Sequence, residues 1–99
     1  MKTIRQQLIN ALMDRDMTAL DLSQELGIRE KEVYEHLPHI ARSVASRGKK
    51  LIMMSPRCLK CGFIFKERTR FTRPGRCPRC RGTYIEAPAY RIEAARRKA

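Results

Sequence analysis

Apolar residues recur at helical spacing from the start of the chain. Ile4, Leu8 and Leu12 fall on one face of a helix, and Thr3 before them is a good helix N-cap. Polar turn formers at residues 14–16 interrupt this pattern. The sequence therefore predicts a first helix that begins after Thr3 and ends near residue 14.

A second helix is predicted after Thr18, which has Asp21 three residues later in a weaker form of the capping box. Leu22 and Leu26 supply the apolar stripe of this helix. Gly27 can take the left-handed backbone conformation that commonly ends a helix. We therefore expect the second helix to stop at this glycine.

The residues around Gly27 are spaced as in a helix-turn-helix. Val33 and Leu37 form the apolar edge of a third helix, which is expected to end or kink at Leu37 because Pro38 disfavours helical geometry in the residue before it. A fourth helical piece would then reach about Arg47. An ordinary helical hairpin has the same periodicity, but the motif fits every position tested. Those positions are Leu22, Ser23, Leu26, Gly27, Ile28, Val33 and Leu37.

Four cysteines stand in the pattern C-x2-C-x15-C-x2-C, which is typical of zinc sites. No secretory signal is visible, so metal binding is expected rather than disulfides. Two facing C-x2-C pairs can complete a tetrahedron of thiolates, with Gly62 and Gly82 easing the turns and residues 63–66 forming a strand between them. The sequence thus predicts a zinc ribbon whose ligands are Cys58, Cys61, Cys77 and Cys80.

Zinc is the expected metal, and iron is the alternative because a rubredoxin-like site uses the same arrangement of thiolates. Four protein ligands leave no open position for water or substrate, so the metal should be structural. No nucleophile–base pair or phosphate-binding loop is evident elsewhere, and we expect no enzymatic activity. His36 and His39 are expected at the surface or the edge of the core rather than as ligands.

Two prolines mark matching edges of the predicted ribbon. Residues 49–54 are strand-like and end at Ser55-Pro56, while residues 89–93 are strand-like and follow Ala87-Pro88. The simplest arrangement is a β-hairpin whose tip has been replaced by the ribbon. The predicted division is a helix-turn-helix core with the first wing strand (1–54), the zinc ribbon (55–88), and the second wing strand with a basic tail (89–99).

With these motifs the chain resembles the prokaryotic predicted transcriptional regulators in which a winged helix-turn-helix is fused to a rubredoxin-like zinc ribbon. The resemblance covers nearly the whole chain and is carried by LSQELGIREKEVYEHLPHI, RGKKLIM, PRCLKCGFIFKERTR, RPGRCPRC and YIEAP. It implies an α+β fold, a winged helix-turn-helix with a four-cysteine zinc ribbon inserted in the wing hairpin. It also implies a role in transcription, by analogy of fold.

Charge divides the chain into two parts. The whole protein has a formal net charge of +12, yet residues 1–37 hold five basic and seven acidic side chains, and residues 38–99 hold seventeen basic and three acidic ones. A polyanionic partner is expected, double-stranded DNA first and an anionic membrane surface as the lesser possibility. No apolar run is long enough to span a membrane, so a cytoplasmic protein is expected.

The predicted third helix is a poor match for DNA because Glu30, Glu32 and Glu35 would face phosphates. Arginine suits phosphate by its bidentate fork, and the ribbon and wing are rich in it. Phe63 and Phe65 are expected to form a small ribbon core. The candidate nucleic-acid contacts are Arg29, Lys31, Tyr34, Lys49, Lys50, Arg57, Lys60, Arg68, Arg70, Arg73, Arg76 and Arg79.

Two functions from different classes follow from this charge pattern. The first is a DNA-binding transcriptional regulator whose contacts lie mainly on the basic ribbon and wing. The second is a protein-interaction or RNA-binding module of the transcription machinery, in which the acidic helix docks a basic protein surface. No oligomeric state follows from the sequence.

Overall fold

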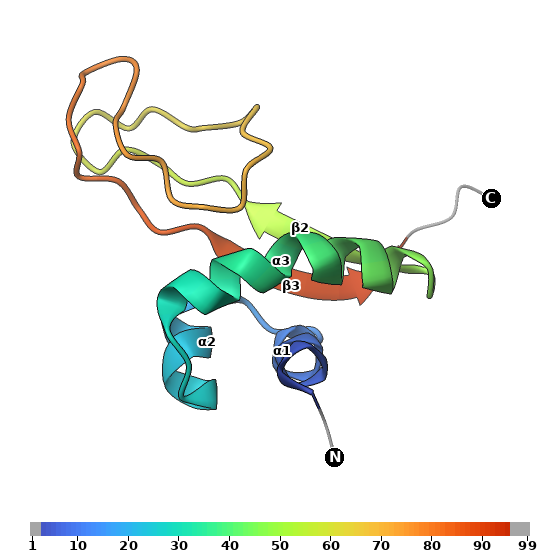
Figure 1. The fold of residues 1–99 in the computed structure, drawn as a ribbon. Helices are drawn as coiled ribbons and strands as arrows, with labels where there is room; N and C mark the ends of the chain where they lie inside the picture. The colour runs from blue at the N-terminus through green and yellow to red at the C-terminus, as the bar shows by residue number, and fades with distance from the viewer. Residues whose placement is uncertain (1–2, 96–99) are drawn as a thin grey trace.

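Three helices and a three-stranded antiparallel sheet make up about half of residues 3–95, the part of the chain that the computed structural model describes (Figure 1). The elements in chain order are α1 (Ile4–Leu12), β1 (Met17–Thr18), α2 (Ala19–Leu26), α3 (Glu30–Ala45), β2 (Lys49–Met54) and β3 (Ala89–Ala94). A long insertion between β2 and β3 contains all four cysteines. The fold is therefore α+β, as the sequence predicted.

The two predicted helix N-caps are confirmed. The Thr3 hydroxyl accepts from the N–H of Gln6 at 3.1 Å. At α2 the capping box is complete and reciprocal: Thr18 Oγ1 accepts from the N–H of Asp21 at 3.1 Å, and Asp21 Oδ2 accepts from the N–H of Thr18 at 3.0 Å. Aspartate thus performs the role that glutamate or glutamine usually has in this motif.

Gly27 ends α2 in the left-handed conformation, with φ of 70°, as expected. Its N–H and that of Ile28 both donate to the carbonyl of Ser23, at 2.9 and 3.1 Å. The Ser23 hydroxyl donates to the carbonyl of Ile28, so this side chain also helps to close the turn. A tight connection to α3 results, with Arg29 as the N-cap residue of that helix.

The expectation that the third helix ends at Leu37 was wrong, because α3 is one helix of 16 residues that contains Pro38. The alternative, a kink at this position, stays a prediction. Val33, Leu37, Ile40 and Val44 lie on one continuous face and are at most 2% exposed. Packing of this face against the other helices and the sheet outweighs the cost of about 3 kcal/mol of a proline within a helix. The expected fourth helical piece is therefore the second half of α3.

The hydrophobic core lies between the three helices and the strand β3, which contributes Tyr90 and Ile92, both completely buried. The short strand β1, which sequence periodicity did not reveal, pairs with β3 through Met17 opposite Tyr90. β3 is thereby the central strand of the sheet, in the order β1-β3-β2. None of the helices in residues 3–95 is long and apolar enough to cross a membrane.

The predicted hairpin is confirmed, and its pairing continues into the ribbon. β2 and β3 are antiparallel from Lys49 opposite Ala94 to Met54 opposite Ala89. Beyond the prolines, Cys58 pairs with Ile85. This pair follows the register of β2 and β3, so neither strand gains an extra residue between the Met54/Ala89 pair and the Cys58/Ile85 pair. The N–H of Glu86 donates to the carbonyl of Arg57 at 2.9 Å. The ribbon therefore continues the hairpin in the same register, and it projects from the helical part in Figure 1.

Candidate metal centre and its basic surroundings

The four cysteine sulfurs lie within 4.8 Å of one another. The Sγ atoms of Cys58 and Cys80 are 3.6 Å apart, and so are those of Cys61 and Cys77. A tetrahedral zinc ion with Zn–S distances near 2.3 Å requires sulfurs separated by about 3.8 Å. The donor set and its spacing fit zinc, and the four cysteines are the ligands of a structural metal site.

The two C-x2-C knuckles are related by an internal repeat of hydrogen bonds. In the first, the N–H of Cys58 donates to Phe63 O at 2.8 Å and the N–H of Gly62 donates to Cys58 O at 2.9 Å. In the second, the N–H of Cys77 donates to Gly82 O at 2.9 Å and the N–H of Arg81 donates to Cys77 O at 2.8 Å. The two knuckles therefore present their cysteines through two backbone turns of the same kind.

Of the two glycines near the knuckles, Gly62 eases its turn as expected, and Gly82 does not take the corresponding position. Gly62 adopts φ of 83°, but in the second knuckle the left-handed residue is Arg81, with φ of 62°, and not Gly82. Gly82 lies close to a ligand instead: a Cβ there would be 3.3 Å from Cys80 Sγ, which is a tight contact. Its N–H also donates to that sulfur at 3.4 Å. Arg81 is thus a residue with a side chain in a conformation that favours glycine.

Backbone N–H groups prepare the thiols for metal binding. A hydrogen bond from the N–H of Cys61 lowers the pKa of Cys58 to about 6. Burial opposes ionisation of Cys77, yet hydrogen bonds from the N–H groups of Cys80 and Arg79 leave its pKa below the usual value. The N–H of Phe63 works to lower the pKa of Cys61, but burial and the neighbouring thiols raise it to about 11.

Four thiolates this close repel one another, so a divalent cation must balance their charge if all are to ionise. When bound, the metal supplies a covalent-like crosslink between the two knuckles. Among the described residues the four cysteines are the one such cluster of potential ligands found, and His36 and His39 lie apart from it on α3, half-buried and exposed. The histidines are therefore not part of this cluster.

A basic loop of the ribbon lies against α3. This loop, residues 67–73, brings Phe71 into contact with the core, where its ring meets that of Tyr90 edge-to-face with centroids 6.2 Å apart. The buried Tyr90 hydroxyl donates to the carbonyl of Phe71. Tyr34 and Pro38 of α3 line one hollow of about 430 Å³ together with Thr69, Arg70, Phe71 and Thr72. Phe71 therefore belongs to the core edge and fixes the loop.

Arg73 and Glu30 both act electrostatically on Tyr34 of α3. Burial raises the pKa of Tyr34, Glu30 raises it further, and Arg73 lowers it, so both charges act on the same phenol. Arg68 has a structural task within the loop, because its guanidinium donates to Thr72 O and to Thr72 Oγ1, each at 3.0 Å. Arg29 pairs with Glu32 at 3.3 Å across exposed surface.

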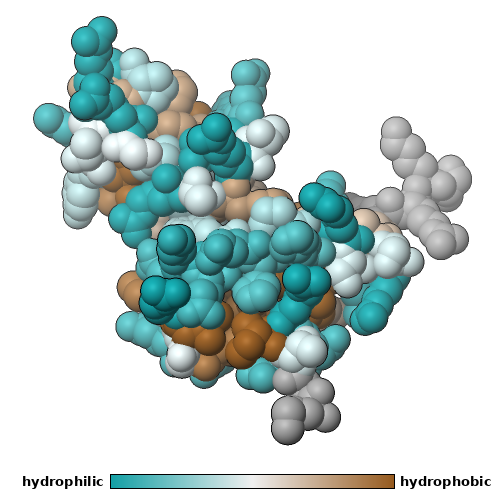
Figure 2. All heavy atoms as spheres, in the orientation of Figure 1, coloured by the Kyte–Doolittle hydropathy of each residue, from teal (hydrophilic) through white to brown (hydrophobic). Residues whose placement is uncertain are grey.

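The structure brings together some of the predicted contact residues and separates others. Arg70 and Arg73 lie in the loop beside Tyr34, whereas Lys49 and Lys50 lie at the opposite end of β2 from the ribbon. Lys31, Arg57, Lys60, Arg76 and Arg79 are exposed. Hydrophilic side chains cover α3 and much of the ribbon in Figure 2. The sequence did not predict that loop 67–73 lies against α3. The signal for it would have been a contact between Phe71 of the loop and Tyr90 of the core.

Fold and site together define a small α+β protein with a structural four-cysteine zinc ribbon extending from a β-hairpin. A family model described as "PF0610-like, N-terminal" matches residues 3–52, and one described as "PF0610 rubredoxin-like zinc beta-ribbon domain" matches residues 56–95. The chain belongs to the PF0610-like family.

A solved structure supports the same arrangement. The solution NMR structure of protein PF0610 from Pyrococcus furiosus is similar to this chain with a TM-score of 0.74 and 29% sequence identity, over 96% of this chain and 90% of that one. Comparison with curated proteins found no match.

Proposed function

We propose that the protein is a cytoplasmic DNA-binding regulator of transcription with a winged helix-turn-helix. In this proposal α2, the turn at Gly27 and α3 are the helix-turn-helix, and the β2–β3 hairpin is the wing that carries the ribbon. The closed four-thiolate site has a structural role, and no catalytic step is assigned to it. Zinc is the resident metal in this proposal.

The observation that carries the proposal is the position of loop 67–73 beside the N-terminal half of α3. The acidic side chains of α3 alone would repel a phosphate backbone. Arg70 and Arg73 lie on the same side of the molecule as Tyr34, and Arg73 acts on the same phenol as Glu30. Loop and helix together form a composite surface whose arginines offset the glutamates, and this surface can approach a duplex.

The experiment is duplex DNA binding as a function of salt, on metal-loaded wild type and on the double variant Arg70→Ala, Arg73→Ala. Arg68 is left intact because its bonds to Thr72 order the loop. The slope of log K against log salt should shrink by roughly 0.9 for each phosphate that the variant no longer neutralises. The control is Arg5→Ala, Arg15→Ala, which removes equal charge from the N-terminal part and should leave the slope unchanged.

An unchanged slope in the Arg70→Ala, Arg73→Ala protein would remove the composite surface from the proposal. Absence of duplex binding by wild type, together with capture of a basic protein that depends on Glu32 and Glu35, would favour the alternative function, a docking module of the transcription machinery.

A further inference from the structure

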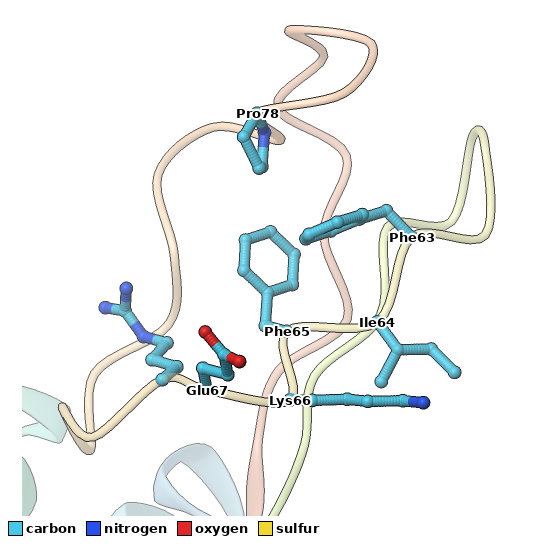
Figure 3. A pocket seen from close by; sticks show the side chains of 7 residues that line it. Phe63, Ile64, Phe65, Lys66, Glu67 and Pro78 are labelled. Carbon is cyan, nitrogen blue, oxygen red and sulfur yellow. The ribbon is translucent and has the colours of Figure 1, made fainter.

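A hollow of about 370 Å³ lies on the ribbon at the start of loop 67–73, and it shares no lining residue with the hollow next to α3. It is lined by Phe63, Ile64, Phe65, Lys66, Glu67, Arg68 and Pro78. This volume lies within the range of about 300–1,000 Å³ that is usual for ligand sites. The hollow is the one drawn in Figure 3.

The two phenylalanines do not form the closed ribbon core that their sequence positions suggested. Phe63 and Phe65 are only half-buried, with centroids 5.1 Å apart and an angle of 88° between the rings. In such an edge-to-face pair at most one ring face is covered by the partner ring. Both rings extend toward Pro78, whereas Ile64 and Lys66 point away (Figure 3). An aromatic surface is therefore left open.

The surroundings of this aromatic surface are basic. Residues 56–88 hold nine basic and two acidic side chains, so that even a zinc ion with four thiolates leaves the ribbon positive. Arg68 lines the hollow and is already held in place by two hydrogen bonds to Thr72. A guanidinium has five N–H donors, so others remain for an oxyanion. A fixed arginine beside an open aromatic ring suits a phosphate next to a flat, uncharged group.

We propose that this hollow is a binding site for an unpaired nucleobase of single-stranded nucleic acid, stacked on Phe65 with a neighbouring phosphate at Arg68. The proposal rests on nucleic-acid binding as the proposed function, and it adds a second mode of contact to duplex binding. Stacking of bases on aromatic rings within a basic groove is the general mode of single-strand binding. An acidic peptide would also suit the cations, but it has less use for an open ring face.

Glu67 gives the site a preference among bases. Its carboxylate lines the hollow on the same side as Phe65. A carboxylate accepts from the exocyclic amino group of cytosine or adenine, and thymine has no such group. The site therefore favours a base with an exocyclic amine over thymine.

The test measures binding of metal-loaded protein to oligo(dC) and oligo(dT), each of about ten nucleotides, and to a mixed-sequence duplex. Phe65→Leu keeps apolar volume but removes the ring, and should weaken oligo(dC) binding about tenfold with duplex binding unchanged. Tyr84→Leu is the control, because Tyr84 is a ribbon aromatic that is 69% exposed and does not line the hollow. Glu67→Gln should reduce the preference for oligo(dC) over oligo(dT).

Several results would overturn the inference. The base site would be ruled out if Phe65→Leu, Tyr84→Leu and wild type bound oligo(dC) equally. It would also be ruled out if the protein bound the duplex but no single strand, a result that would leave the proposed function intact. Failure to bind either form would remove both. Binding of poly-Glu that depends on Phe65, without oligonucleotide binding, would assign the hollow to a protein partner. The cobalt-substituted absorption spectrum should match wild type in every variant, which verifies that the ribbon is intact.

Discussion

The hydroxyl of Tyr90 joins the ribbon to the core, and its removal should have a measurable cost. Tyr90 is completely buried in the central strand, and its hydroxyl donates to the carbonyl of Phe71 in loop 67–73. Tyr90→Phe removes one oxygen and leaves the ring packed. A hydrogen bond of this kind contributes about 0.5–1.5 kcal/mol. For a domain of this size, a loss of about 1 kcal/mol lowers Tm by roughly 4–8 °C.

The assay is thermal unfolding of metal-saturated protein, followed by far-UV circular dichroism. Tyr84→Phe is the matched control, since Tyr84 is 69% exposed and its Tm should equal that of wild type. Backbone amide shifts of loop 67–73 should change in Tyr90→Phe and not in the control. Equal Tm and equal loop shifts for Tyr90→Phe and wild type would refute the view that this bond anchors the loop.

Alkaline pH provides a second readout of the same bond. Burial raises the pKa of Tyr90 above its ordinary value near 10, as Tyr34 does to a lesser extent. A folded-state pKa above the unfolded one means that the folded protein holds the proton longer. The contribution of the protonated Tyr90 hydroxyl to the free energy of unfolding is therefore complete below pH 10 and is lost as pH rises through the folded pKa. The difference in stability between wild type and Tyr90→Phe should narrow above about pH 10.

Three further substitutions test other parts of the structure. Arg81→Gly should raise Tm, with a gain in stability of up to about 1 kcal/mol, because it relieves a left-handed φ, whereas Arg79→Gly removes the same charge without that gain. Cys58→Ser should abolish metal binding and unfold the ribbon, but it should keep the helical circular dichroism signal because the core is built from the helices and β3. Metal analysis of the wild-type protein should give zinc, and a red, iron-containing protein would contradict this. Glu32→Gln with Glu35→Gln should tighten duplex binding roughly fivefold at low salt, about 0.5 kcal/mol per removed charge at 8 Å, and Glu25→Gln should not; unchanged affinity would place α3 away from DNA.

The metal site and the hairpin could be predicted because their determinants are local. Paired cysteines fix two knuckles by spacing alone, and the flanking Pro56 and Pro88, both fully buried, bound the insertion. The unchanged register across these prolines could not be predicted, because alternation is weak in strands of six residues. β1, only two residues long, carries no periodicity at all.

The misjudged features depend on tertiary packing. Pro38 normally ends a helix, but the buried stripe that continues to Val44 keeps α3 intact. Arg81, in place of Gly82, takes the left-handed position because the first knuckle's hydrogen-bond pattern is repeated one residue earlier than the glycine. The contact of Phe71 with Tyr90 joins segments 19 residues apart, which no local pattern could reveal.

In the function proposed above, duplex DNA binds the composite surface formed by α3 and loop 67–73. The most direct measurement is a titration of 15N-labelled, metal-loaded protein with a mixed-sequence duplex, followed by amide chemical shifts. If the duplex binds there, the largest changes should fall in residues 29–34 and 67–73, with smaller ones elsewhere in the ribbon. Changes confined to residues outside this surface, or no changes at all at low salt, would contradict it.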